Sequence, residues 1–391
     1  MNYENLDTPC FILVEQELFD SIKGFQEALG CNFQKSIVGY SVKTNSLPYA
    51  LKQAIRLGCY AEVVSGDEYQ LAKECGCPIN HIIYNGPSKT KETFLEAITE
   101  GAIVNIEAFR EIEWLKDLPL DKKFKIGIRL NIDISMISPA DENHENDNSR
   151  FGFSAESGDF EKAIESIKKI SNIQLVGLHT HRTSRTRSLD FYKNVIQYTQ
   201  TIISKYNLQL EYWDLGGGYF GMMPNKPTYK DYSDAFFQSM NESNRNLTII
   251  VEPGNALVAS AFDYVTSVID IKEHDNALYV TTNGTRNDID PFFHKTSYFH
   301  ETLTAADKTS DKQQIVCGST CLEYDRLFTI ECGQKALQLG DKIIYHRVGA
   351  YTMCLTPLFI NYFPIVYTID RNGKISVARN RWSAKDYTKQ S

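Results

Sequence analysis

The sequence predicts a barrel of alternating β-strands and α-helices, followed by a separate β domain. Between about residues 25 and 265, short apolar, β-branched runs alternate with amphipathic helical patterns, which is typical of a parallel sheet wrapped by helices. After about residue 265, runs such as 277–282 and 342–346 occur without helical patterns between them. Several early runs end in polar or glycine-rich residues, where a TIM-type (β/α)8 barrel places its active site.

The expected elements follow in chain order. Residues 8–14 form an apolar run that we expect to pair with the late strands, so residues 1–24 are assigned to the β domain. The strands expected in the barrel are residues 36–40, 82–84, 103–106, 124–129, 175–179, 212–215 and 248–252, and the helices include 65–75 and 160–170. The predicted division is therefore a barrel over residues 25–265 and a β domain over 266–391.

Composition excludes several classes of function. The 391 residues are 42% hydrophobic, enough for two packed domains, and the net charge of −8 argues against nucleic acid or an anionic membrane surface as a partner. No run approaches the roughly 20 apolar residues of a membrane span, and no signal peptide is recognisable. Nine scattered cysteines indicate free thiols in the cytoplasm, and none has the spacing of a zinc site, so no metal is predicted. The polar run 141–148 is expected to be a solvated loop.

One lysine, Lys43, follows the apolar run 36–40 almost directly. Burying an ammonium group is costly, and desolvation lowers the pKa of an amine. An amine in that state can form a Schiff base with a carbonyl compound. A lysine at the end of a strand is more often solvated, so Lys43 alone is a weak indication.

Other strands end in groups suited to a phosphorylated aromatic ring. Three glycines, 216–218, let backbone N–H groups approach an anion, although an ordinary turn explains them equally well. Glu252 can keep a pyridine nitrogen protonated, or can cap the next segment. His181 can stack on a ring and Ser184 can bind phosphate, although a lone histidine is usually structural. Residues 317–325 combine thiols, a tight turn and carboxylates.

Together these motifs resemble the pyridoxal-phosphate-dependent decarboxylases of fold type III, which include diaminopimelate and ornithine decarboxylases. The family pattern Tyr-Ala-x-Lys-Ala-Asn is similar to residues 40–45, Asp-Val-x-Ser to 62–65, and Gly-Ala-Tyr to 349–351. The order and spacing of the motifs match over nearly the whole chain. The resemblance implies an alanine-racemase-like architecture, pyridoxal 5'-phosphate as cofactor, and a homodimer with shared active sites.

The resemblance also implies roles for single residues. Lys43 is the expected catalytic Schiff-base lysine, and Cys321 is the expected catalytic proton donor, reaching into the neighbouring subunit's site. The implied cofactor-binding residues are Lys43, His181, Ser184, Gly216, Gly217, Gly218, Glu252, Gly254 and Tyr351. The predicted activity is that of a lyase that removes CO2 from an amino acid.

The positions expected to bind substrate depart from the family. Where those enzymes carry Glu or Asp after the cysteine, this chain has Leu322, followed by Glu323. The arginine that holds the distal carboxylate of diaminopimelate aligns with Asp290, and a family tyrosine aligns with His294. These four are the predicted substrate-binding residues. They argue against diaminopimelate and favour a diamino acid, whose distal amine meets Asp290 or Glu323, or a conjugated amino acid of a specialised pathway.

A basic position is lost as well, because Asn255 replaces the arginine of Glu-Pro-Gly-Arg; Arg182 or Arg185 could compensate. Two other functions fit the same motifs. One is an amino-acid racemase on this fold, against which the region around Cys321 argues. The other is a non-catalytic pyridoxal-phosphate-binding protein, which the long β domain disfavours.

Overall fold

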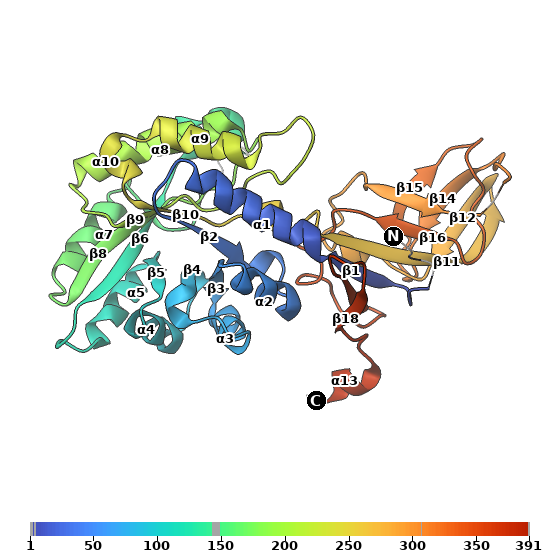
Figure 1. Cartoon of the computed structure of the whole chain (residues 1–391), viewed down its shortest axis with the longest axis horizontal. Coiled ribbons are helices and arrows are strands. Elements are labelled where there is room, and N and C mark those ends of the chain that lie inside the picture. Colours follow the sequence, from blue (N-terminus) through green and yellow to red (C-terminus); the bar gives the residue numbers. More distant parts are fainter. Residues whose placement is uncertain (1–2, 4, 143–148, 306, 390–391) are drawn as a thin grey trace. The chain divides into compact units, whose positions relative to one another are not determined.

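The structure, a computed structural model, describes all residues except 1–2, 4, 143–148, 306 and 390–391 (Figure 1). The chain forms two compact units, one of residues Phe19–Leu257 and one of Met1–Leu18 with Val258–Ser391. These unit boundaries, after Leu18 and Leu257, lie a few residues before the predicted domain boundaries after residues 24 and 265. Of the predicted loop at 141–148, residues 143–148 lie outside the described residues.

In the described part of the first unit, eight parallel strands close a barrel in the order β5-β4-β3-β2-β10-β9-β8-β6, with β6 pairing back to β5. These strands are β2 (Ser36–Ser41), β3 (Tyr60–Ser65), β4 (Ile82–Ser88), β5 (Ile103–Ile106), β6 (Phe124–Asn131), β8 (Ile173–His179), β9 (Tyr212–Asp214) and β10 (Thr248–Val251). A short β7 (Phe153–Ser154) pairs with the end of β6. The predicted (β/α)8 barrel is confirmed.

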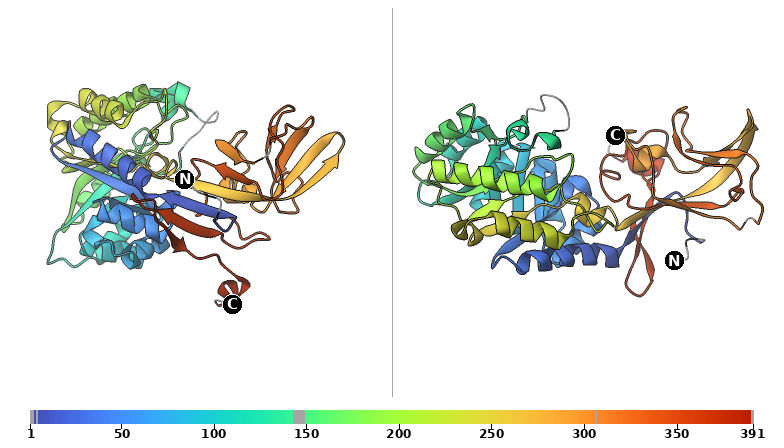
Figure 2. Two further views of the ribbon diagram at one scale, coloured as in Figure 1. Left: turned by 45° about the vertical axis from the view of Figure 1, so that its right-hand side comes forward. Right: turned by 90° about the horizontal axis from the view of Figure 1, so that it is seen from above.

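Helices alternate with these strands and surround the barrel, as the further views in Figure 2 show. They are α1 (Glu15–Gly30), α2 (Pro48–Arg56), α3 (Gly66–Glu74), α4 (Lys91–Thr99), α5 (Phe109–Trp114), α6 (Ile134–Ile137), α7 (Asp159–Lys168), α8 (Leu189–Lys205), α9 (Tyr229–Ser239), α10 (Glu242–Arg245) and α11 (Asn255–Val258). Side-chain caps fix several starts: Ser65 ends β3 and accepts a hydrogen bond from Glu68 N, and Thr228 forms a capping box with Asp231. The described residues include no helix that is both long and apolar enough to cross a membrane.

A polar layer fills the barrel interior near one end of its short strands. The Tyr212 hydroxyl donates to Asn105 Oδ1 (2.8 Å). The ring of Tyr212 needs glycines beside it, because a Cβ added at Gly177 would lie 1.9 Å from its Cζ atom. The lumen is therefore packed with side chains, and the strand ends above this layer carry the groups described below.

The second unit is built on a sheet whose main order is β15-β14-β12-β11-β1-β17-β18, with β16 pairing with β11 and β13. Its elements are β1 (Cys10–Val14), β11 (Phe262–His274), β12 (Ala277–Thr282), α12 (Arg286–Ile289), β13 (His300–Leu303), β14 (Gln313–Cys317), β15 (Arg326–Ile330), β16 (Lys342–Tyr345), β17 (Ile365–Ile369), β18 (Ile375–Arg379) and α13 (Ala384–Thr388). The N-terminal strand β1 lies antiparallel to β11 and parallel to β17. The expected β domain with an N-terminal strand is thus confirmed.

Candidate active site

Lys43 lies in a single 3-10 turn, Val42–Thr44, that directly follows β2. Its Nζ atom lies 2.5 Å from Glu62 Oε2 and 2.8 Å from Ser41 Oγ. The register of β2 on β3 pairs Ser41 with Glu62, which explains why the carboxylate reaches the amine. Glu62 is buried, whereas the Lys43 side chain is 36% exposed, so the amine is held by a fixed partner and still accessible.

Two buried carboxyl groups end neighbouring strands: Asp214 closes β9, and Glu252 follows β10. Burial raises the pKa of Asp214, and burial together with the charges of Asp214 and Glu62 raises the pKa of Glu252. A carboxylate oxygen of Asp214 and one of Glu252 lie within 4.8 Å of each other, so the charge of Asp214 disfavours ionisation of Glu252.

Two asparagines that sequence reasoning missed connect these acids. Asn85, on β4, donates from Nδ2 to Glu252 Oε1 (2.5 Å) and Glu62 Oε1 (3.3 Å). Asn105, on β5, donates to Asn85 Oδ1 (2.8 Å) and to Asp214 Oδ2 (3.4 Å). The only available signal in the sequence is a polar residue inside each of two apolar strands. The network links the lysine's partner to the carboxyl pair across the barrel.

Two histidines lie at the end of β8: His179 is its last residue, and His181 follows two residues later. His181 accepts a hydrogen bond at Nδ1 from Gly217 N (3.0 Å), and its ring lies 6.2 Å from the ring of His179 at an interplanar angle of 13°. Burial, the largest cause, lowers the pKa of both imidazoles, so both are neutral. His179 Nε2 lies 3.6 Å from Glu252 Oε2. One ring nitrogen of His179 and one carboxylate oxygen each of Glu252 and Asp214 lie within 4.8 Å of one another. This set suits the binding of a cofactor ring nitrogen or of a divalent metal ion.

Two glycines, Gly217 after β9 and Gly254 after β10, lie so close to neighbouring segments that only glycine fits at each position. A Cβ added at Gly217 would lie 2.4 Å from the backbone oxygen of Glu252, and one at Gly254 would lie 2.2 Å from Thr44 Oγ1. The two neighbours of Gly217 adopt positive φ angles of 68° and 96°. The structure therefore brings together Lys43, His181, Gly216, Gly217, Gly218, Glu252 and Gly254, all at the carboxyl ends of the barrel strands.

Ser184, for which a phosphate contact is predicted, forms hydrogen bonds within the protein. Its hydroxyl donates to Asp141 Oδ1 (2.6 Å) and accepts the N–H of Arg187 (2.8 Å). Thr186 N also donates to Asp141 (3.1 Å). Although burial acts to raise the pKa of Asp141, these hydrogen bonds lower it, so the carboxylate is ionised. The single hydrogen of the Ser184 hydroxyl is therefore already directed at a protein acceptor.

The β unit carries the remaining predicted residues. Cys321, Leu322 and Glu323 lie on the loop between β14 and β15, where Cys321 and Glu323 are exposed. Asp325 fixes this loop, because its buried carboxylate accepts hydrogen bonds from Thr320 N (3.1 Å) and Thr320 Oγ1 (2.6 Å). The loop lines a pocket of about 470 Å³.

Asp290 is held by protein donors. Arg286, one turn earlier on α12, donates to Asp290 Oδ2 from Nε (2.9 Å) and from its terminal nitrogen (2.8 Å). Tyr298 Oη (3.1 Å) and the N–H of His294 (3.0 Å) also donate to this carboxylate. Tyr351 is 45% exposed and adopts a φ of 55°. Asp290 thus neutralises an arginine of its own helix and is poorly available to a substrate amine.

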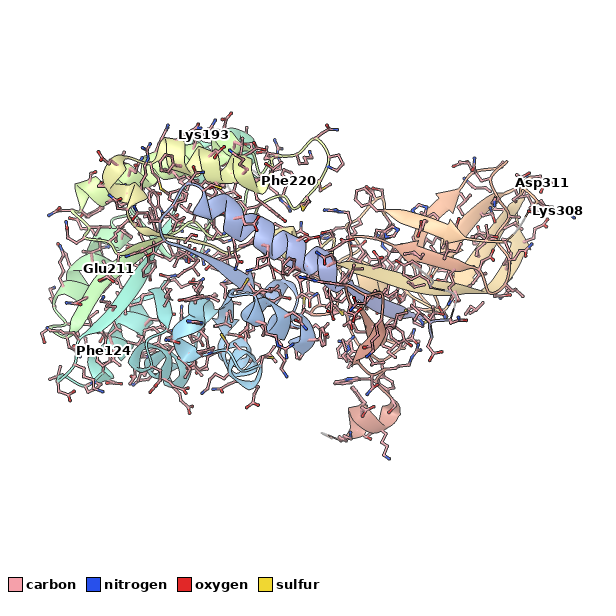
Figure 3. All side chains as sticks on the ribbon, viewed as in Figure 1. Phe124, Lys193, Glu211, Phe220, Lys308 and Asp311 are labelled. Carbon is pink, nitrogen blue, oxygen red and sulfur yellow. The ribbon has the colours of Figure 1, made fainter. Side chains whose placement is uncertain are left out.

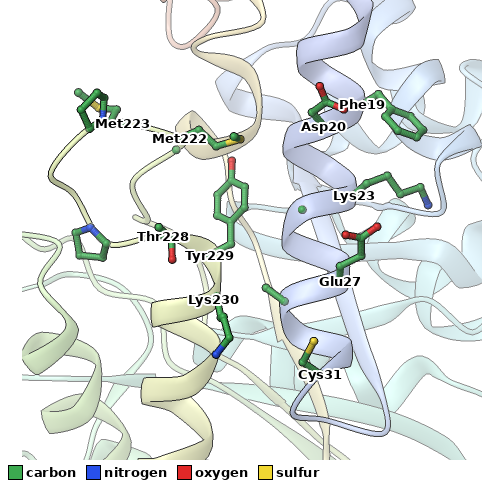
Figure 4. A pocket seen from close by; sticks show the side chains of 15 residues that line it. Phe19, Asp20, Lys23, Glu27, Cys31, Met222, Met223, Thr228, Tyr229 and Lys230 are labelled. Atoms are coloured by element: carbon green, nitrogen blue, oxygen red, sulfur yellow. The ribbon is translucent and has the colours of Figure 1, made fainter.

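A groove of about 840 Å³ in the barrel unit lies elsewhere, between α1 and the segment that leads into α9 (Figure 4). Apolar side chains such as Phe19, Met222 and Tyr229 line it. None of the predicted site residues does so. The chemistry-bearing groups are therefore separate from this groove.

Comparisons with known proteins place these groups in a family context. Residues 16–259 match the family model described as the pyridoxal-binding domain of pyridoxal-dependent decarboxylases. A diaminopimelate decarboxylase of Zymomonas mobilis is 28% identical over 393 residues, which cover 97% of this chain and 91% of the relative. A probable chloroplastic diaminopimelate decarboxylase of rice is 28% identical over 399 residues, which cover 98% of this chain and 79% of the relative.

Solved structures share the fold. A diaminopimelate decarboxylase of M. jannaschii superposes with a TM-score of 0.86 at 23% identity, covering 98% of this chain and 92% of that one. A lysine/ornithine decarboxylase of Vibrio vulnificus, solved with putrescine, has a TM-score of 0.75 at 20% identity, with 95% and 96% covered.

Proposed function

The chain belongs to the pyridoxal-dependent decarboxylases, and from this we propose that it releases the carboxyl group of an amino acid as CO2, with pyridoxal phosphate as its cofactor. One observation carries the proposal: an accessible lysine amine, a buried carboxyl pair and a neutral histidine meet at the carboxyl ends of the barrel strands. This is the end at which (β/α)8 barrels place their catalytic groups.

The residues fit the cofactor group by group. Lys43 offers the amine that holds an aldehyde, and Glu62 keeps that amine in place. His181, neutral and fixed by Gly217, offers a flat face to an aromatic ring. The glycine loop 216–218 has no side chains to keep a phosphate away from its backbone N–H groups. When bound, pyridoxal phosphate supplies an electron-poor ring that accepts the electron pair left by the departing CO2.

The carboxyl pair sets the charge at the ring nitrogen. Asp214 and Glu252 lie together with raised pKa values, and Asn85 donates to Glu252 at 2.5 Å. A carboxylate of this buried pair favours a protonated ring nitrogen, which makes the ring a stronger electron acceptor. A divalent metal ion held by the same residues and His179 would compete with that role.

We propose that Cys321 returns the proton to the reacting carbon and that it comes from the second subunit of a homodimer. Its thiol is exposed on a loop that Asp325 fixes, so a partner site can reach it. All nine cysteines are free thiols, which supports the proposed location in a reducing compartment such as the cytoplasm.

The substrate that we propose is a diamino acid or a conjugated amino acid rather than diaminopimelate, the substrate named for several relatives. Leu322 cannot pair with an ammonium group, and Arg286 already occupies Asp290. Glu323, exposed beside Cys321, is then the carboxylate that meets a distal amine. The arginine decarboxylase of Paramecium bursaria Chlorella virus, another structural neighbour, shows that the fold accommodates other distal groups.

Release of CO2 from a panel of amino acids tests this function. The panel contains diaminopimelate, lysine, ornithine, arginine and acylated diamino acids, with Lys43→Ala protein as the blank. We expect turnover of a diamino or conjugated acid, and a higher KM for Glu323→Gln than for the exposed control Glu331→Gln. Preferred turnover of diaminopimelate would contradict the substrate. Racemisation of an optically pure amino acid without CO2 release would contradict the reaction.

A further inference from the structure

Several donors in the loops that should bind the cofactor phosphate are engaged within the protein. Gly216 N–H donates to a buried carboxylate (2.9 Å), and Gly217 N–H donates to an imidazole (3.0 Å). The Ser184 hydroxyl donates to Asp141 (2.6 Å). Asn255 stands where the resemblance expects an arginine. A cation from another position would strengthen the binding of a phosphate dianion here.

Arg187 is held beside the glycine loop by three contacts. Its N–H donates to Ser184 Oγ (2.8 Å), and its carbonyl oxygen accepts the hydroxyl of Tyr232 (2.8 Å). The oxygen of that same hydroxyl accepts the N–H of Phe220 (3.2 Å), two residues after Gly218. The guanidinium carbon of Arg187 lies 5.4 Å from the centre of the ring of Phe220, which is labelled in Figure 3. One tyrosine thus ties the arginine to the loop that the phosphate approaches.

The positive charge of Arg187 acts on Tyr192, a residue that contacts that loop. Burial raises the pKa of Tyr192, and the positive charge of Arg187 acts against this rise. The hydroxyl of Tyr192 donates to the carbonyl oxygen of Gly217 (3.1 Å). The arginine is therefore close enough to act electrostatically on a group that contacts the glycine loop.

The backbone of Arg187 is also unusual, because its φ of 53° lies in the left-handed region that arginine seldom adopts. Residues in such conformations persist only where the surroundings fix them, and they are frequent at binding sites. Arg185, in the same segment, differs: it is exposed, and its guanidinium donates to the carbonyl oxygen of Ala140 (3.0 Å). It is directed at another segment and serves as a matched control.

We propose that Arg187 binds the phosphate group of the cofactor and replaces the cation that is absent at Asn255. This inference rests on the proposed function, and it assigns the phosphate a partner that the family resemblance does not supply.

Binding of pyridoxal phosphate and of pyridoxal, which lacks the phosphate, to cofactor-free protein tests the assignment. We expect Arg187→Gly to weaken pyridoxal phosphate binding by about tenfold to a hundredfold, as for the loss of a charge-assisted hydrogen bond, with pyridoxal binding unchanged. Arg187→Lys should retain most of the affinity, and Arg185→Gly all of it. Because glycine accepts a φ of 53° without strain, Arg187→Gly should keep the melting temperature of the cofactor-free protein.

Equal affinities of wild type and Arg187→Gly for pyridoxal phosphate would overturn the assignment and leave the proposed function standing. A parallel loss of pyridoxal binding or of melting temperature would also overturn it, because the arginine would then be structural. Failure of the wild-type protein to bind pyridoxal phosphate would overturn the proposed function itself.

Discussion

Replacing Glu111 by leucine should destabilise the barrel unit, because it leaves a buried ammonium group unpaired. Lys89 Nζ lies 3.2 Å from Glu111 Oε1 and donates to the carbonyl oxygen of Gly86 (2.8 Å), and neither charged side chain has exposed surface. Burial lowers the pKa of Lys89 and raises the pKa of Glu111, so desolvation outweighs their mutual attraction. Glu111 also accepts the N–H of Glu107 (2.9 Å), whose carboxylate pairs with Arg129 (2.8 Å).

Removing one partner of a buried ion pair typically costs about 3–5 kcal/mol, whereas replacing both by apolar residues is often neutral. We therefore expect Glu111→Leu to lower the free energy of unfolding by about 3–5 kcal/mol, and Lys89→Met/Glu111→Leu to recover most of this loss. Glu113→Leu is the control, because its pair with Lys116 is largely exposed and should contribute less than about 1 kcal/mol.

Urea denaturation of the cofactor-free proteins at pH 7, followed by circular dichroism, measures the three differences. The reasoning is refuted if the double variant is no more stable than Glu111→Leu. A loss for Glu111→Leu no larger than that for Glu113→Leu would refute it as well.

Three further predictions follow from single positions. Gly217→Ala should weaken pyridoxal phosphate binding by about tenfold or more, since its Cβ would lie 2.4 Å from a backbone oxygen, whereas Gly30→Ala, which meets nothing within 4 Å, should not change the same titration. Burial raises the pKa of Asp288 from 3.8 to about 7, so the folded state favours its protonated form. The contribution of Asp288 to the free energy of unfolding is therefore fully present below about pH 4 and is lost as the pH rises to about 7. Asp288→Asn should remove up to about 4 kcal/mol of this pH dependence in urea titrations, and an unchanged slope would contradict it. Cys321→Ala should slow CO2 release by about a hundredfold or more and leave pyridoxal phosphate affinity intact, while the exposed control Cys332→Ala should change neither.

The fold was predictable because its strands have strong local patterns. The apolar run 248–252 predicts β10, and the run 8–14 predicts β1, including its pairing with late strands. β3 is harder to predict from the pattern of apolar residues, because the charged Glu62 interrupts that pattern. Its carboxylate instead pairs with Lys43. The polar residues that serve the site are thus the ones that weaken the pattern of their own strands.

The site was predictable only where a motif lies in one short segment. Asn85 and Asn105 escaped because each is a lone asparagine whose partners are far along the chain; Asn85 and Glu252, for example, are 167 residues apart. The contact between the Ser184 hydroxyl, a predicted phosphate donor, and Asp141 spans 43 residues. Local patterns indicate which residues carry chemistry, whereas long-range contacts decide which of their donors remain free.

Borohydride reduction of the protein loaded with pyridoxal phosphate, followed by peptide mass spectrometry, tests the central claim most directly. We expect one pyridoxyl adduct, on the Lys43 amine that lies 2.5 Å from Glu62. An adduct on a different lysine, or an unmodified protein, would contradict the account.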